Sequence, residues 1–131
     1  MNESKWRFFE KMGNYRVQDL GRPAIFLIPV GKLQQKIGRL TIEEYLETFL
    51  KKHFRAFTRS QAYIRGYWEG HVDDLVEFEV SFLGKENIPL LLHELAFIAR
   101  KMGEACIYIK AGQYTGLVFP KIQKKIYKKS P

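Results

Sequence analysis

The segment LTIEEYLETFLKKHF, residues 40–54, constrains the fold most, because its apolar residues recur at helical spacing. Thr41 followed by Glu44 is the pattern of a capping box, in which each side chain binds the backbone N–H of the other residue. The apolar residues form one stripe: Ile42, Leu46, Phe49, Leu50 and Phe54. The sequence therefore predicts a helix that begins after Thr41 and packs one face against a core.

A second helix is predicted over residues 86–103, ENIPLLLHELAFIARKMG. Pro89 falls in the first turn, where its missing N–H costs nothing, and Gly103 is a typical C-terminal stop. Its expected buried stripe consists of Leu91, Leu92, Leu95, Ile98, Ala99 and Met102.

Four segments favour strands. Residues 24–30, AIFLIPV, are apolar on both faces and predict a central strand with Pro23 and Pro29 at its ends. Residues 61–70, QAYIRGYWEG, and 75–84, LVEFEVSFLG, alternate with a period of two and predict two antiparallel strands joined through residues 70–74. Residues 105–112, ACIYIKAG, predict a fourth strand, followed by the short extension YTGLVFP.

The alternation also predicts which side chains face the core. On the second strand we expect Ala62, Ile64, Gly66 and Trp68 to face inward, and Tyr63, Arg65, Tyr67 and Glu69 to face the open side. On the third strand the inward residues are Val76, Phe78, Val80 and Phe82.

The order strand, helix, strand, strand, helix, strand predicts an α+β fold. It is the ferredoxin-like βαββαβ sandwich, in which two helices cover one face of a four-stranded antiparallel sheet. We expect this domain to span residues 23–120, preceded by an arm or short helix over residues 1–22 and followed by a lysine-rich tail over residues 121–131.

The net charge of +8 lies mostly at the chain ends. Residues 1–22 carry +2, residues 23–120 carry +1, and residues 121–131 carry +5. A basic tail can bind nucleic acid without sequence preference or can simply keep the protein in solution, and both readings stay open. The candidate nucleic-acid residues are Lys121, Lys124, Lys125, Lys128 and Lys129.

Composition also bears on location. No apolar run approaches the roughly 20 residues that span a bilayer, and the N-terminal residues do not resemble a signal peptide. Cys106, the single cysteine, cannot form an internal disulfide, which fits a reducing compartment. We therefore expect a cytoplasmic protein that has no membrane partner.

The sequence offers little for metal or nucleophilic chemistry. His53, His71, His93 and Cys106 are far apart in the chain, and HELAF lacks the second histidine of the zinc-protease helix. We predict no metal site and no cofactor. The stretch GYWEGHVDD leaves Glu69, His71, Asp73 and Asp74 as candidate acid–base groups at the hairpin end, although the same residue types suit a polar turn.

The face of the sheet that no helix covers is a candidate partner surface. If the first strand is apolar on both sides, some of its apolar side chains face the open side, either Ile25 and Leu27 or Phe26 and Ile28. We expect a partner-binding face made of Phe26, Ile28, Tyr63, Arg65, Tyr67 and Tyr108. Glu77 and Glu79 on the third strand argue against RNA binding on this face.

The pattern IFLIPV, LTIEEYLETFL, GYWEG, EFEVSF and LAFIARKMGEACIYI, over residues 24–119, resembles small uncharacterised bacterial and phage-type domains of ferredoxin-like fold. The resemblance implies no settled activity and no catalytic residues. We therefore predict a non-catalytic binding or regulatory module that forms a homodimer through its open sheet face. The alternatives are a small enzyme that uses the hairpin end and an accessory nucleic-acid binder that uses the lysine tail.

Overall fold

The computed structural model describes residues 6–121, which form a mixed α and β fold with three α-helices and a six-stranded antiparallel sheet. The helices are α1 (Trp6–Glu10), α2 (Ile42–His53) and α3 (Asn87–Met102), and η1 (Val30–Lys32) is a single 3-10 turn. The strands of the large sheet are β1 (Arg22–Pro29), β4 (Phe57–Arg59), β5 (Ile64–Trp68), β6 (His71–Phe82), β7 (Ile107–Ala111) and β8 (Tyr114–Val118).

The large sheet runs in the order β4-β6-β1-β7-β8, and β5 also pairs with β6. β4 pairs with residues 78–80 of β6 and β5 with residues 71–75, so these two short strands follow one another along the same side of β6. β1 lies between β6 and β7, with Phe26 and Ile28 buried on one face and Ile25 and Leu27 partly buried on the other.

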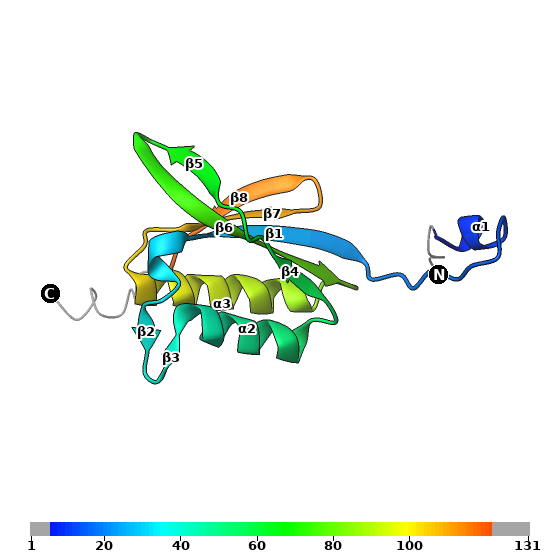
Figure 1. The fold of residues 1–131 in the computed structure, drawn as a ribbon, viewed down its shortest axis with the longest axis horizontal. Helices are drawn as coiled ribbons and strands as arrows, with labels where there is room; N and C mark the ends of the chain where they lie inside the picture. Colours follow the sequence, from blue (N-terminus) through cyan, green and yellow to red (C-terminus); the bar gives the residue numbers. More distant parts are fainter. Residues whose placement is uncertain (1–5, 122–131) are drawn as a thin grey trace, which may run out of the picture.

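α2 and α3 lie side by side against one face of the sheet, and the hairpin of β5 and β6 rises from the opposite face (Figure 1). Phe26 of β1 and Phe78 of β6 stack in the core with ring centroids 5.3 Å apart. Both are fully buried, together with most of the apolar stripes of the two helices.

Both predicted long helices are confirmed. The Thr41 hydroxyl accepts a hydrogen bond from the Glu44 N–H at 3.0 Å, and the Glu44 carboxylate accepts one from the Thr41 N–H at 2.9 Å. α3 ends at Gly103, which has a φ of 74° in the left-handed region and donates its N–H to the carbonyls of Ala99 and Arg100.

The sequence predicted a sheet of four strands, and the large sheet has six. β8 is a full strand that pairs with β7, where the sequence suggested only an extension, and β4 adds a segment that the alternation did not reveal. The segment between β1 and α2 contains a two-stranded hairpin of β2 (Lys36–Ile37) and β3 (Leu40–Thr41). Short strands of two or three residues carry too few side chains to show a period.

The arm ahead of β1 extends away from the sheet and ends in α1 (Figure 1). None of the residues in α1 is buried. No helix within residues 6–121 has the length and apolar character needed to cross a membrane.

Candidate functional site

The open face of the sheet is formed by the side chains of β1, β6 and β7 that alternate with the buried ones. Ile25 and Leu27 of β1 lie there, because Phe26 and Ile28 are fully buried on the helix side. The prediction that Phe26 and Ile28 belong to a partner face was therefore wrong. Their partners across the β1–β6 ladder, Phe78 and Val76, are also fully buried, and directly paired residues share a face.

The predicted orientation of β5 was reversed as well. Ile64, Gly66 and Trp68 pair with Leu75, Asp73 and His71, which alternate with the helix-facing residues of β6. These three β5 residues therefore lie on the open side, and Arg65 and Tyr67 point to the other side. Tyr63 precedes the strand and is 60% exposed. Of the predicted partner face, only Tyr108 of β7 lies where it was expected.

A two-residue turn sets this register. Glu69 has a φ of 46° and Gly70 a φ of 85°, which are the paired positive values of a type I′ turn. β6 begins directly after it at His71. Residues 71–74 of the predicted connection are therefore strand, and a shift of one residue in register moves every β5 side chain to the other face.

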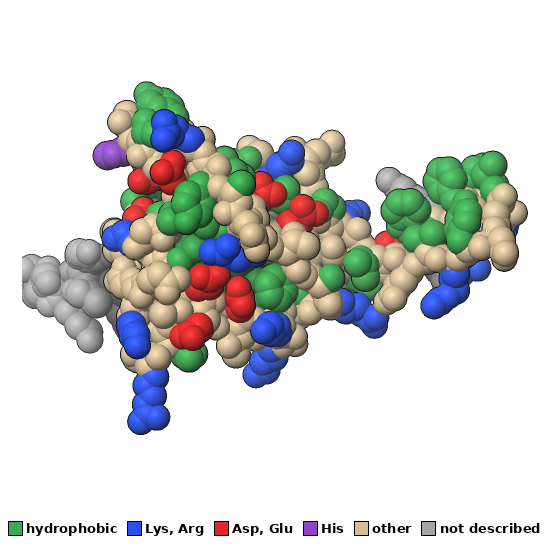
Figure 2. All heavy atoms as spheres, viewed as in Figure 1, with side chains coloured by type: hydrophobic (Ala, Val, Ile, Leu, Met, Phe, Trp, Pro, Cys, Tyr) green, Lys and Arg blue, Asp and Glu red, His purple; other side chains and the backbone are tan. Residues whose placement is uncertain are grey.

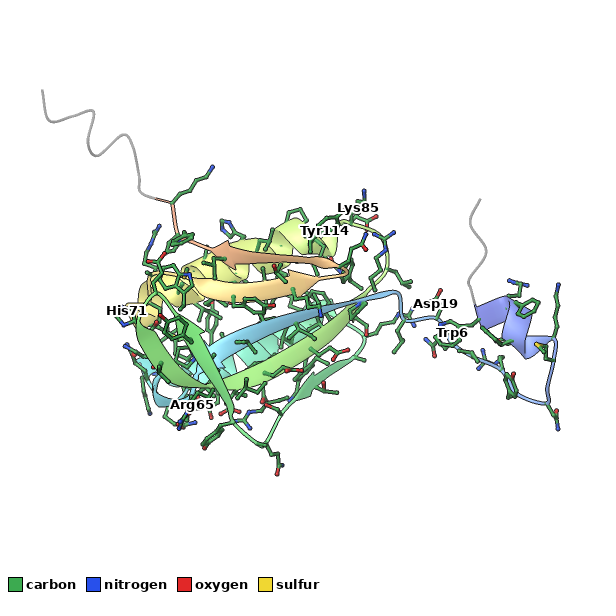
Figure 3. The ribbon with its side chains drawn as sticks, turned by 90° about the horizontal axis from the view of Figure 1, so that it is seen from above. Trp6, Asp19, Arg65, His71, Lys85 and Tyr114 are labelled. Carbon is green, nitrogen blue, oxygen red and sulfur yellow. The ribbon has the colours of Figure 1, made fainter. Side chains whose placement is uncertain are left out.

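A pocket of about 530 Å³ lies on the open face, between the β5–β6 hairpin and the segment that enters β7. Viewed from above, the hairpin crosses the sheet at the end where His71 is labelled (Figure 3). The pocket is lined by Leu27, Pro29, Gly66, Tyr67, Trp68, His71, Asp73, Leu75, Glu104, Ala105, Cys106, Tyr108 and Leu117.

Gly66 leaves space that the side chain of Leu75 fills in this pocket. A Cβ atom built on Gly66 would lie 2.6 Å from Cδ1 of Leu75 on the neighbouring strand. The absence of a side chain lets Leu75 occupy that space, so both residues form one wall of the pocket.

The structure does not bring all four predicted acid–base residues together. His71 and Asp73 both line the pocket from the same face of β6. Asp74 is on the opposite face, where its Oδ1 lies 3.5 Å from Nε of Arg65 in an exposed ion pair. Glu69 lies in the turn at the tip of the hairpin.

Glu104 is a pocket residue that the sequence did not identify, and Cys106 lies close to it on the same open face. Both residues lie just before β7, about thirty residues after the β5–β6 hairpin in the chain. Only the pairing of strands in the sheet brings them next to this hairpin. Oε2 of Glu104 lies 3.8 Å from Nζ of Lys32, which also donates a hydrogen bond to the Met102 carbonyl at 2.9 Å. No motif in GEACIYI marks these residues as a site.

Two carboxylates act on the thiol of Cys106 in this pocket. Burial raises the pKa of the Cys106 thiol, and the carboxylates of Glu104 and Glu69 raise this pKa further. A thiol with a raised pKa keeps its proton at neutral pH and is a poor nucleophile. Among the residues that the structure describes, no lysine or arginine lines the pocket.

The lysine-rich tail, the other predicted binding site, lies mostly outside the described residues. Four of the five tail lysines, Lys124, Lys125, Lys128 and Lys129, lie outside the described residues, so nucleic-acid binding by the tail stays a prediction. Lys121 is exposed, and its carbonyl accepts a hydrogen bond from Arg100. Within residues 6–121 no group of three His, Cys, Asp or Glu side chains is placed to hold a metal ion.

Comparison with known proteins assigns no family. No protein-family model matches the chain, and no curated protein matches it either. Among solved structures, a phage SAM lyase in complex with S-methyl-5'-thioadenosine is similar with a TM-score of 0.47 and 11% identity, over 80% of this chain and 94% of that one. A likeness at this level carries no argument about the fold or the activity of this protein.

Proposed function

We propose that the protein binds a small organic cation with an apolar part in the pocket on its open sheet face. The observation that carries the proposal is the lining itself: the aromatic residues Trp68 and Tyr108, both on the open face, occur together with the carboxylates of Asp73 and Glu104, and lysine and arginine are absent from the described lining. Aromatic faces and carboxylates both attract cations.

The size of the pocket supports this class of ligand. Small-molecule sites commonly have volumes of roughly 300–1,000 Å³ and a mainly apolar lining with a few polar groups that orient the ligand. This pocket has about 530 Å³, with Leu27, Leu75 and Leu117 among its apolar residues. A ligand can bury its apolar part against these leucines and place its charge near the acids.

The proposal is tested with phenyltrimethylammonium, a model organic cation, and benzenesulfonate, an anion of similar size. Titration followed by two-dimensional NMR is expected to shift the amides of residues 64–75 and 104–108 with the cation only. Equal binding of the two probes, or shifts confined to residues away from the pocket, would overturn the proposal.

Two neighbouring aspartates of β6 provide a matched pair of variants. Asp73→Asn removes a pocket carboxylate and is expected to weaken cation binding about tenfold. Asp74→Asn makes the same chemical change on the opposite face, beside Arg65, and is expected to change the affinity less than about twofold. Equal effects of both substitutions would show that the cation responds to net charge rather than to the pocket.

Acid–base catalysis in the same pocket is the second candidate function, because His71 and Asp73 lie on one face of β6 and line the pocket together with Glu104. We expect His71→Asn to leave cation affinity within about twofold, because the substitution keeps a polar side chain and removes none of the pocket's carboxylates. If the protein is an enzyme, the same change abolishes turnover of the bound compound, measured by NMR of the small molecule over time. Unchanged turnover in this variant would remove His71 from the mechanism.

We assign the core of the fold as ferredoxin-like on the basis of its connectivity. β1, α2, the edge formed by β4 and β5, β6, α3 and β7 occur in the order of the βαββαβ unit, and their strands lie in the order edge-β6-β1-β7. In this assignment β8 is an addition to the β7 edge, and the ligand pocket lies on the face opposite the helices.

A further inference from the structure

A second apolar hollow of about 820 Å³ lies at the opposite end of the sheet from the ligand pocket. Its lining includes Arg22, Phe82, Lys85, Ile88, Pro89 and Tyr114, and it shares no residue with the ligand pocket. Tyr114 at its rim is 74% exposed, and Leu83 and Leu90, the chain neighbours of lining residues, are 52% and 37% exposed. Its described lining contains no acid or histidine, so it is suited to docking rather than to proton transfer.

The N-terminal arm, residues 6–21, presents apolar side chains away from the body of its own chain (Figure 2). Phe8, Phe9, Met12 and Tyr15 are 47–69% exposed. The rings of Phe8 and Phe9 pack edge to face at 5.4 Å, and the Tyr15 hydroxyl donates a hydrogen bond to the Phe9 carbonyl at 2.7 Å. The arm thus has an organised aromatic surface that needs a partner to be shielded from water.

The root of the arm lies beside the hollow. In Figure 3, Lys85 and Tyr114 are toward the same end of the sheet as Asp19, and the chain leaves the sheet beyond Asp19 as the arm that carries Trp6. The Gly21 N–H binds Oδ1 of Asp19 at 2.8 Å, and Gly21 has a φ of 92°. A Cβ on Gly21 would lie 1.8 Å from the Phe82 carbonyl oxygen, so this backbone passes closely over the end of β6 and leaves the body there.

We infer that the arm of one copy docks into the hollow of a second copy, and that the exchange is reciprocal in a twofold dimer. The arm and the hollow lie at the same end of each chain. A twofold axis near that end can therefore place the arm of each copy against the hollow of the other copy. The chemistry is complementary: the apolar lining accepts Phe8 and Phe9, and the cations of Arg22 and Lys85 meet the negative faces of the incoming rings.

The association is tested by sedimentation velocity of the full chain up to about 200 µM. A concentration-dependent dimer is expected. The double variant Phe8→Ser with Phe9→Ser and the double variant Lys85→Glu with Tyr114→Glu should each weaken this dimer by at least about tenfold. All four positions are exposed, so an unchanged circular dichroism spectrum and melting temperature are expected and exclude misfolding.

Tyr63→Ser serves as the matched control, because Tyr63 is 60% exposed and belongs to neither the arm nor the hollow. Its dimer affinity should stay within about twofold of the unmodified protein. A monomer at the highest concentration, or equal weakening by the control, would overturn the inference.

Mixing the two double variants distinguishes arm-to-hollow docking from contact between two arms. The mixture retains one intact arm and one intact hollow, so a labelled hollow variant should bind the arm variant more tightly than either variant binds itself. If arms pack against arms, the hollow variant alone should dimerise like the unmodified protein. The ligand pocket lies at the other end, so phenyltrimethylammonium affinity in all variants reports the proposed function separately.

Discussion

At the scale of single residues, Glu69 stands out because it holds a conformation that favours glycine or asparagine. It is the only non-glycine residue with a positive φ within residues 6–121. The first position of a type I′ turn strongly prefers Asn, Asp or Gly. A glutamate there costs stability, and its carboxylate helps to raise the pKa of the Cys106 thiol.

Replacing Glu69 by asparagine is therefore expected to stabilise the protein by about 0.5–1 kcal/mol, because asparagine adopts the left-handed conformation more readily. Urea denaturation measures the change. Gly70→Ala in the same turn, at a φ of 85°, should destabilise the protein by about 1 kcal/mol or more. A loss of stability in Glu69→Asn would mean that the glutamate makes a stabilising contact that outweighs its backbone conformation.

The titration of Cys106 gives a second prediction at this scale. Because burial, Glu104 and Glu69 raise the pKa of this thiol above its usual 9.0, alkylation by iodoacetamide at pH 8 should be slower than that of an unstructured cysteine. Glu104→Gln should lower the pKa and speed the reaction, whereas Glu79→Gln, which does not act on Cys106, should not.

The sign of the effect on stability follows from proton binding. As pH rises above 9, the unfolded chain releases the Cys106 proton while the folded chain still holds it. The stability that this group contributes is complete below the unfolded pKa and is lost as the pH rises through the folded pKa. Cys106→Ala should remove this part of the alkaline decline in unfolding free energy.

At the scale of elements, α2 shows how local chemistry can specify a helix. Thr41, Glu44 and the apolar stripe were readable because all of them lie within one segment, and both capping hydrogen bonds form. Burial follows the same stripe, with Ile42, Leu46 and Leu50 fully buried.

Thr41→Ala removes the hydroxyl that caps α2 and should lower the free energy of unfolding by about 1 kcal/mol, measured in urea. Thr48→Ala is the control within the same helix. The Thr48 hydroxyl only donates to the Glu44 carbonyl, so its loss should change stability by less than about 0.5 kcal/mol. Equal losses would contradict a specific role for the cap.

The strands were predicted less fully than the helices. The period of two in β5 was visible, but its facing depends on register, and register depends on whether the turn holds residues 69–70 or residues 70–74. Both turns are compatible with the glycine and acids in GYWEGHVDD. The same limit applies to β1, where apolar residues on both faces leave the choice between Phe26 and Leu27 open.

The facing of β1 yields a direct test. Phe26→Ala should cost about 3–5 kcal/mol, because the ring is fully buried and stacks on Phe78. Ile25→Ala, on the open face, should cost about 1 kcal/mol. Urea denaturation of both variants measures the difference, and similar losses would contradict the assignment of the core face.

At the scale of the whole molecule, the two hollows lie at opposite ends of one sheet and differ in chemistry. The ligand pocket combines rings with Asp73 and Glu104, and the other hollow is apolar with Arg22 and Lys85. Since the two sites share no residue, ligand binding and association should be independent.

This independence is measurable. Phenyltrimethylammonium at saturation should raise the melting temperature by mass action without changing the dimer dissociation constant more than about twofold. Calorimetric melting and sedimentation with and without the cation make the comparison. A larger change in the dissociation constant would show that the sheet couples its two ends.

The sequence by itself determined the two long helices, their caps and buried stripes, and the presence of alternating strands. Each of these features depends on residues that are close together in the same segment of the chain. Only the tertiary structure decided which face of β5 lines the pocket and that His71 and Asp73 meet Glu104 and Cys106. Those contacts join segments about thirty residues apart, and their geometry depends on a turn register and a sheet order that no local pattern specifies.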